Sequence, residues 1–183
     1  MRKLSHNELL TRQSEAIRAK ETIPLTVVLN NIRSLYNVGS IFRTADGVGV
    51  EKIWLAGITG FPGTERSRIE KTALGAEKNV PWEYCENPIP IIRNLKKQGY
   101  EIVLLEQASE SISYQDYQPQ RPVCLVVGNE ISGISDELLA LADRAIEIEM
   151  SGLKNSLNVT VAFGVVAYHL KHYLKTSRIT ALI

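Results

Sequence analysis

The sequence predicts an α/β domain with a mostly parallel sheet flanked by helices. Short apolar and β-branched segments alternate along the chain with longer segments of helical periodicity. The segment 123–127, VCLVV, is a continuous apolar run, which suits a strand buried on both faces of a parallel sheet. The 183 residues, 44% of them hydrophobic and 22% charged, match a soluble globular protein of ordinary size. We therefore expect a single domain over 1–183 that begins with a short basic helix at about 5–20.

Five of the six expected helices have a sequence signal near their start, and the helix at 69–76 has none. Ser5 and Glu8 form a capping-box pattern before the first helix. Asn37, Ser135 and Ser156 are placed to cap three later helices, because asparagine and serine are favoured at that position. A Pro-in, Gly-out pattern bounds the helix before the fourth strand. The expected helices cover 7–18, 37–48, 69–76, 88–98, 136–142 and 156–175.

The expected strands are short segments rich in β-branched or apolar residues. They cover 25–29, 52–56, 80–84, 100–105, 123–127 and 145–148. In open parallel sheets, ligands bind beyond the carboxyl ends of the strands. The loops 30–37, 128–135 and 150–155 follow such ends, so we expect them on the functional side.

The charge is nearly balanced overall but not along the chain. The net charge of +1 excludes a strongly basic nucleic-acid binder. Basic residues nevertheless gather near both ends, at Arg2, Lys3, Arg12, Arg18 and Lys20, and at Lys171, Lys175 and Arg178. From charge alone, a phosphate-binding rim and ordinary solvated helix faces remain equally open.

The cysteine pattern favours a reducing compartment. Cys85 and Cys124 lie in or beside apolar segments, and neither has a cysteine or histidine at metal-ligand spacing. The N-terminal MRKLSHNELL lacks the apolar core of a secretory signal, and no apolar run approaches ~20 residues. We expect buried reduced thiols, no metal and a cytoplasmic location.

Each of the three loops is ambiguous when taken alone. In the first loop, Asn37 and Arg43 are consistent with a helix cap and a surface arginine as well as with a functional site. In the second, Gly128 and Glu130 read as a turn after a strand, with neither a G-x-G-x-x-G nor a phosphate-loop motif. The third, MSGLKNSLNVTVA (150–162), suits a helix start and a ligand-binding loop equally well.

The three segments together are far more specific. The patterns N-x-G-x-x-x-R-T-A-D, V-G-N-E-x-x-G-I-S and M-x-G-x-x-x-S-L-N-V occur in this order. They resemble the three signature motifs of the SpoU/TrmH family of RNA ribose methyltransferases, within the SPOUT superfamily. The resemblance covers about 25–174, and TALGAEKNVPW (72–82) looks like the segment that connects the first two motifs in many members.

This resemblance implies a fold and a reaction. It implies S-adenosylmethionine as methyl donor, a ribose 2′-hydroxyl of RNA as acceptor, a homodimer, and a deep trefoil knot from about 123 to the last helix. The implied reaction is an in-line displacement, in which the enzyme mainly aligns the reactants and manages one proton. The cofactor residues map to Leu105, Gly128, Glu130, Ile148, Met150, Ser156 and Leu157.

The family's catalytic arginine maps to Arg43, supported by Asn37, Glu130, Ser156 and Asn158. A guanidinium group stays protonated in proteins, so arginine is a poor general base. Either the site makes the Arg43 guanidinium far easier to deprotonate, or Arg43 binds an RNA phosphate and polarises the ribose oxygen while the proton of the hydroxyl leaves elsewhere. The chain departs from the family at Glu149, where a proline usually precedes the methionine of the third motif. The loss of a rigid proline puts the cofactor affinity in doubt.

The RNA substrate is less defined than the reaction. Further phosphate contacts are expected from Arg33, Arg66, Arg68 and Lys71. A compact chain without an added RNA-binding domain favours tRNA over ribosomal RNA, by analogy, and the nucleotide cannot be read. Two alternatives stay open, a non-catalytic RNA-binding or ribosome-assembly factor with the same fold and a SPOUT enzyme that methylates a base.

Overall fold

The computed structural model describes residues 1–19, 21–63 and 66–180, without the side chains of 13, 16–19, 66–67 and 176–180. Seven strands form one sheet: β1 (Ile23–Asn30), β2 (Val50–Ala56), β3 (Trp82–Cys85), β4 (Glu101–Leu105), β5 (Ile112–Ser113), β6 (Val123–Val127) and β7 (Arg144–Glu147). Their order is β3-β2-β1-β6-β4-β7-β5, and every pairing is parallel. The predicted fold class is confirmed.

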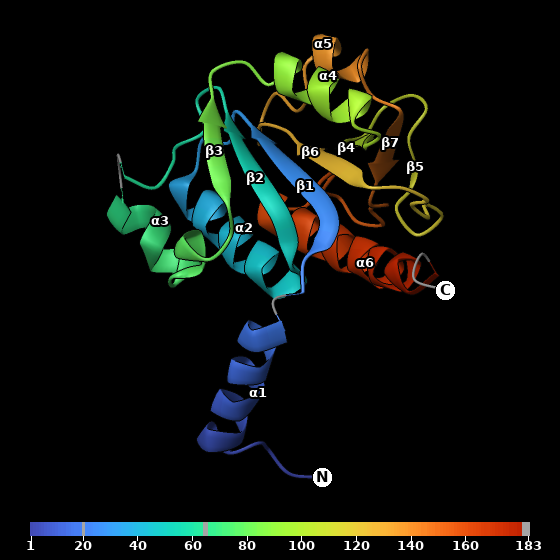
Figure 1. Cartoon of the computed structure of the whole chain (residues 1–183). Coiled ribbons are helices and arrows are strands. Elements are labelled where there is room, and N and C mark those ends of the chain that lie inside the picture. The colour runs from blue at the N-terminus through green and yellow to red at the C-terminus, as the bar shows by residue number, and fades with distance from the viewer. Residues whose placement is uncertain (20, 64–65, 181–183) are drawn as a thin grey trace.

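Helices cover both faces of this sheet (Figure 1). The helices of the described residues are α1 (His6–Ala19), α2 (Leu35–Val48), α3 (Arg66–Ala73), the short 3-10 helix η1 (Ala76–Lys78), α4 (Ile89–Lys97), α5 (Asp136–Leu139) and α6 (Val159–Thr180). One face is covered by α2, α3 and α6, and the other by α4 and α5. Such two-sided cover is what a parallel sheet requires, because both of its faces are apolar.

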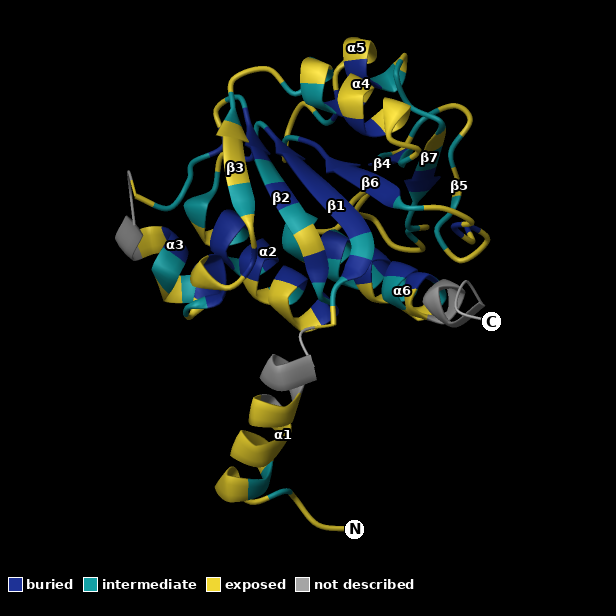
Figure 2. Cartoon of the chain, in the orientation of Figure 1, coloured by how far each residue is buried: buried dark blue, intermediate teal, exposed yellow. Residues whose placement is uncertain are grey.

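The alternation of side chains along the strands explains the two layers. Leu25, Val27 and Leu29 of β1 pack in the core beneath α2 and α6, whereas Val28 packs in the core beneath α4. All residues of β6 are buried, and Figure 2 shows this strand and most of β1 as a continuous buried centre. The strand predicted from VCLVV is therefore central in the sheet, as a continuous apolar run requires.

Two predicted helix caps are wrong. Ser34, not Asn37, caps α2, because its side-chain oxygen accepts a hydrogen bond from the Asn37 backbone N–H at 3.3 Å. Asn158, not Ser156, caps α6, because Asn158 Oδ1 accepts from the Thr160 backbone N–H at 2.9 Å. Ser135 does occupy the cap position of α5, without a side-chain hydrogen bond to the helix.

Several boundaries also differ from the prediction. The helix expected over 69–76 corresponds to α3, which ends at Ala73, and to the short helix η1 that follows. Leu74 and Gly75 both have positive φ, which ends the α-helix and separates α3 from η1. Val80 was predicted to begin a strand, but its N–H bonds to Ala76 O at the end of η1, so β3 begins at Trp82. The two-residue β5 was not predicted because it is too short to show a periodicity.

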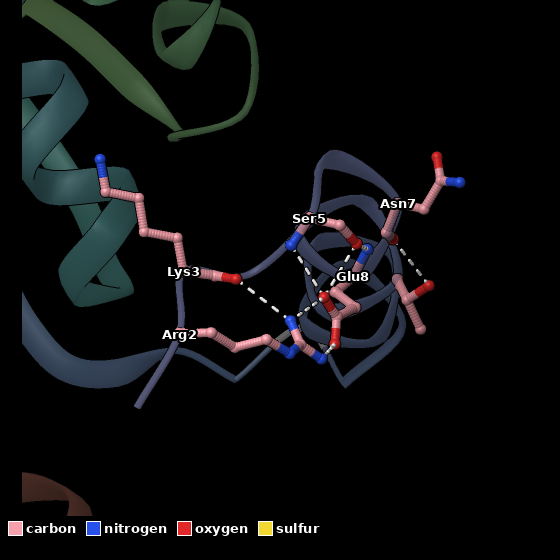
Figure 3. A network of polar contacts seen from close by, with 6 residues as sticks. Arg2, Lys3, Ser5, Asn7 and Glu8 are labelled. Carbon is pink, nitrogen blue, oxygen red and sulfur yellow. Dashed lines mark hydrogen bonds and ion pairs between the residues drawn. The ribbon is translucent and has the colours of Figure 1, made fainter.

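The capping box before α1 is confirmed (Figure 3). The Ser5 backbone N–H donates to Glu8 Oε2 at 2.8 Å, and the Glu8 N–H donates back to Ser5 Oγ at 3.4 Å. Arg2 adds a two-pronged ion pair to the same carboxylate. The Arg2 side chain, followed by the Ser5 donors, lowers the pKa of Glu8 to about 2. Beyond this start, α1 extends away from the sheet (Figure 1), and a single domain over the whole chain stays a prediction.

Cys124 fits the expectation of a buried thiol, while Cys85 is only partly buried. Burial in the centre of β6 raises the pKa of Cys124 to about 12, which makes this thiol unreactive. Among the helices of the described residues, none is long and apolar enough to cross a bilayer. The trefoil knot expected for the C-terminal part stays a prediction.

Candidate active site

A pocket of about 520 Å³ lies at the carboxyl ends of β4, β6 and β7, next to the start of α6. Its volume falls in the ordinary range for small-molecule sites. Most of the predicted cofactor residues line it, namely Leu105, Gly128, Glu130, Ile148, Ser156 and Leu157. Met150 does not line it, and the departing residue Glu149 is exposed outside it. The three predicted loops therefore do lie on one side of the sheet, around one cavity or beside it.

The second loop needs glycine at its first position. A Cβ on Gly128 would lie 2.7 Å from the Gly133 carbonyl carbon and 2.8 Å from its oxygen. This close approach exists because Asn129 and Gly133 exchange two backbone hydrogen bonds, of 3.1 and 3.0 Å, that fold the loop back on itself. Gly133 itself has a φ of 66°, which favours glycine. The two glycines of the motif thus shape the pocket wall.

Asn129 ties the second loop to the first, a role that the sequence did not reveal. Its side-chain amide donates to Asn31 O at 2.7 Å, and its Oδ1 accepts from the N–H groups of Ile131 and Ser132 at 2.9 and 3.0 Å. Asn31 has a φ of 60°, a conformation that asparagine tolerates better than most residues. Asn129 therefore holds both its own loop and the bend after β1.

Glu130 completes this link at the start of α2. Its carboxylate accepts from the backbone N–H groups of Arg33 at 3.1 Å and Ser34 at 3.3 Å, and from the Asn37 side-chain amide at 2.8 Å. Partial desolvation raises the pKa of Glu130, but these donors outweigh it, and the net effect is a lowered pKa. The ionised carboxylate sits where the helix dipole favours a negative charge.

The third loop joins the same chain of contacts. Asn158 Nδ2 lies 3.5 Å from Asn37 Oδ1, while Asn158 Oδ1 caps α6. The predicted residues Asn37, Glu130 and Asn158, which are far apart in the sequence, are thus linked side chain to side chain. Asn37 lies within the first turn of α2, behind the cap residue Ser34, and its side chain is turned toward Glu130 and Asn158.

Arg43 and Ser156 are placed differently. Ser156 lines the pocket, with an exposed side chain. Arg43 lies on the exposed face of α2, lines none of the cavities at this edge, and its guanidinium has no partner among the described residues. The structure therefore does not bring Arg43 into contact with the other predicted catalytic residues, and leaves its charge open to a ligand.

Two pocket residues after β4 were missed. Glu106 Oε2 accepts from the Ile134 N–H at 3.0 Å in the second loop. Gln107 Nε2 donates to Asn155 O at 2.6 Å in the third loop. The only available signal was their position directly after a buried strand, at the carboxyl edge where ligands bind. They brace two of the loops that line the pocket.

The charged residues that line the pocket are all acidic. They are Glu106, Glu130 and Glu147, and no lysine, arginine or histidine is among the described lining residues. Apolar walls from Leu105, Ile148 and neighbouring side chains accompany them. A cationic ligand with an apolar and a polar part fits this lining, whereas a polyphosphate does not.

The expected RNA-contacting residues are only partly brought together. Arg33 and Arg68 line a second hollow beside the first loop, Lys71 is exposed on α3, and the side chain of Arg66 lies outside the described residues. Of the C-terminal basic residues, Lys171 donates to Gly47 O at 2.8 Å and Lys175 pairs with Glu21 at 2.6 Å. The side chains of Arg18, Lys20 and Arg178 also fall outside the description.

A parallel sheet with a ligand pocket built from strand-end loops defines a ligand-binding α/β protein. Comparison with known proteins identifies the family. The chain belongs to the SpoU rRNA methylase family, whose model matches residues 24–168. The family resemblance seen in the three motifs is confirmed.

Named relatives and solved structures agree with this assignment. The chain is 33% identical over 160 residues to the tRNA (guanosine(18)-2′-O)-methyltransferase of Aquifex aeolicus, covering 87% of this chain and 74% of the relative. The Escherichia coli K12 enzyme of the same name is 32% identical over 150 residues, and the match spans 82% of this chain but only 64% of the relative.

Solved structures share the fold of this chain, among them two at 30% and 28% identity. The Aquifex aeolicus TrmH/SpoU tRNA modifying enzyme superposes with a TM-score of 0.79 at 30% identity, covering 94% of this chain and 88% of that one. An AdoMet-bound rRNA methyltransferase from Sinorhizobium meliloti superposes with a TM-score of 0.75 at 28% identity, covering 82% and 56%.

Proposed function

We propose that this chain transfers a methyl group from S-adenosylmethionine to a ribose 2′-hydroxyl of tRNA. The observation that carries the proposal is the convergence of the three motif loops. Glu130, Asn37 and Asn158 join them beside a pocket of suitable size and charge. The names of the Aquifex and Escherichia coli relatives support tRNA and the 2′-oxygen. The rRNA methyltransferase among the structural neighbours makes ribosomal RNA the alternative substrate.

The pocket fits the proposed methyl donor. Bound S-adenosylmethionine supplies a methyl group that its positive sulfur activates. The carboxylates of Glu106, Glu130 and Glu147 give the pocket a negative lining that suits this charge. Leu105, Ile148 and Leu157 would pack against the apolar part of the donor.

The neighbouring polar residues would position the acceptor. Asn37 and Asn158 are fixed by their mutual contact and by Glu130, so their remaining donors and acceptors are preorganised for a ribose. Arg43, about one and two-thirds turns further along α2, would hold an RNA phosphate and polarise the 2′-oxygen. We prefer this role to that of a general base because a guanidinium stays protonated.

We also propose a homodimer and a cytoplasmic location. The neighbouring helices α2 and α6 carry exposed side chains, among them Arg43, Val161 and Tyr168. A partner packed on this surface would bring a second chain beside Arg43. Light scattering coupled to gel filtration tests the dimer, and the mass of a single chain would contradict it. The location follows from the tRNA substrate and the free thiols.

Arg43→Ala tests the proposed reaction. We expect the wild-type protein to bind S-adenosylmethionine in calorimetry and to methylate an unmodified tRNA transcript on a ribose, as located by mass spectrometry of digested RNA. Arg43→Ala should abolish transfer and keep donor binding, because Arg43 does not line the donor pocket. Arg93→Ala, an exposed arginine on α4 at the opposite face, is the matched control and should remain active.

Each other outcome contradicts a stated part of the proposal. Full turnover by Arg43→Ala would remove Arg43 from the reaction. A methyl group on a base would identify a base-methylating enzyme, and no donor binding by the wild-type protein would favour a non-catalytic RNA-binding factor.

A further inference from the structure

A second hollow, of about 420 Å³, lies between the start of α2, the loop after β2 and α3. Its lining includes Arg33, Ser34, Tyr36, Ile58 and Arg68. These residues come from three separate parts of the chain, so no single motif predicts the hollow. It combines positive charge with aromatic and apolar surface, which is unlike the acidic donor pocket.

The two cavities adjoin at one contact. Glu130 lines the donor pocket, and its carboxylate accepts from the backbone N–H groups of Arg33 and Ser34, which line the hollow. A molecule in the hollow would therefore lie next to the acceptor site that Asn37 and Asn158 border.

The positive charge at the hollow comes from the side chains of Arg33 and Arg68. The N–H groups of Arg33 and Ser34 already bond Glu130, so the start of α2 has these donors occupied. The guanidinium of Arg33 is exposed and has no partner among the described residues, and Arg68 lies across the hollow on α3. Two arginines at one hollow are a typical arrangement for a phosphate group.

The apolar part of the hollow suits a base. The Tyr36 side chain is 46% exposed and Ile58 is 68% exposed, although both are large apolar groups. The Tyr36 ring makes no ring contact within the described residues. Its backbone is held in place, because Thr72 Oγ1 donates to Tyr36 O at 3.0 Å. A fixed, exposed aromatic residue beside arginines is a common platform for an unpaired base.

We propose that this hollow binds a nucleotide of the RNA that neighbours the methylated one. Arg33 and Arg68 hold its phosphate, and its base stacks on Tyr36 and packs against Ile58. The inference rests on the proposed function, because it takes RNA as the substrate. It adds a subsite, outside the three motif sites, that positions the substrate strand next to the reacting ribose.

RNA affinity and its salt dependence test the subsite. Binding of an unmodified, fluorescently labelled tRNA transcript is measured by anisotropy across a range of salt concentrations. Arg33→Ala should weaken binding and reduce the slope of log K against log salt by about 0.7–0.9, the value for one lost phosphate contact. Arg33→Lys should restore the slope. Arg93→Ala, which removes the same charge from the opposite face, should leave the slope unchanged.

The stacking contact has its own variant pair. Tyr36→Ala should weaken RNA binding by about 5- to 150-fold, following the range for one aromatic–base stack. Tyr36→Phe keeps the ring and should bind like the wild-type protein. Neither change touches the donor pocket, so calorimetry should show unchanged affinity for S-adenosylmethionine.

The failure of the subsite is distinguishable from the failure of the proposed function. If Arg33→Ala and Tyr36→Ala bind RNA with wild-type affinity and salt slope, the subsite is wrong, while methylation by the wild-type protein still supports the function. If the wild-type protein binds no S-adenosylmethionine and methylates no RNA, the function is wrong, and the RNA-binding variants still decide on the subsite. Loss of binding by Tyr36→Phe as severe as that by Tyr36→Ala would exclude stacking.

Discussion

Replacing Glu130 with alanine should destabilise the protein through the start of α2 rather than through its core. The carboxylate accepts three hydrogen bonds, from the N–H groups of Arg33 and Ser34 and from the side chain of Asn37. It is the charged group that joins the second loop to this helix. The substitution leaves the buried apolar residues in place, because Glu130 belongs to neither core.

The expected size of the effect follows from these contacts. Hydrogen bonds to a charged group contribute about 1.5–3 kcal/mol when buried, but Glu130 is exposed and water can replace it. Loss of a helix-capping side chain costs about 0.5–2 kcal/mol. We therefore expect the free energy of unfolding to fall by about 1–2 kcal/mol. For a chain of this length, each kcal/mol shifts Tm by about 2–4 °C, so Tm should fall by about 2–8 °C.

The difference in Tm between the wild-type protein and Glu130→Ala should depend on pH. The pKa of Glu130 in the folded protein is lowered from the ordinary value of 4.5. The carboxylate therefore contributes its full stability above pH 4.5, and this contribution is lost as the pH falls through the folded pKa. The gap in Tm between wild type and Glu130→Ala should be widest at neutral pH and narrow below pH 4.5.

Thermal unfolding followed by circular dichroism at a series of pH values measures this gap. Glu130→Gln is the control, since its amide oxygen can still accept one of the backbone N–H bonds but carries no charge. It should lose less stability than alanine and show no titration of this group. A Glu130→Ala protein as stable as the wild type at pH 7, or a gap that widens in acid, would refute the assigned role of the carboxylate.

Two further substitutions test the other loops. Gly128→Ala places a Cβ 2.7 Å from the Gly133 carbonyl carbon. We therefore expect the free energy of unfolding, measured with urea, to fall by about 1–3 kcal/mol, and S-adenosylmethionine binding in calorimetry to weaken. Wild-type values in both measurements would contradict the close approach. Asn158→Ala removes the cap of α6 and the contact to Asn37, so methyl transfer should fall further than donor affinity, with a stability loss of about 0.5–2 kcal/mol. Asn158→Asp keeps the capping oxygen and should recover the stability but not the transfer; recovery of both would show that only the cap matters.

The architecture could be predicted because it depends on local patterns. Apolar strands such as 123–127 alternate with helices, and a parallel sheet with two covered faces follows from them. Helix starts could not be placed as well. Asn37 and Ser156 are favoured capping residues, yet Ser34 and Asn158 do the capping. Asn37 instead lies inside α2 and bonds Glu130, which lies 93 residues away in the chain, and local capping preferences contain no information on such a tertiary contact.

The site could be predicted where a side chain has chemistry of its own. Glu130 and Asn158 stand out in the motifs because carboxylates and amides next to glycines indicate ligand loops. Asn129 and Glu106 escaped prediction because they act on backbone groups of other loops. Their partners are backbone N–H and C=O groups, which nearly every residue has, so the sequence at the partner positions contains no trace of the contact.

These interloop contacts separate the stability of the sheet from the order of the site. The Glu106 side chain forms a hydrogen bond with the second loop, and the Gln107 side chain forms one with the third loop. The Asn129 side chain forms a hydrogen bond with the first loop. Individual hydrogen bonds of this kind contribute about 0.5–1.5 kcal/mol, which is small beside the burial of the apolar strands. Loss of one contact should therefore disorder a wall of the pocket before it unfolds the domain. We therefore expect binding affinities, rather than Tm, to be the sensitive measure of these residues, because loops that admit ligands generally belong to the less stable parts of a fold.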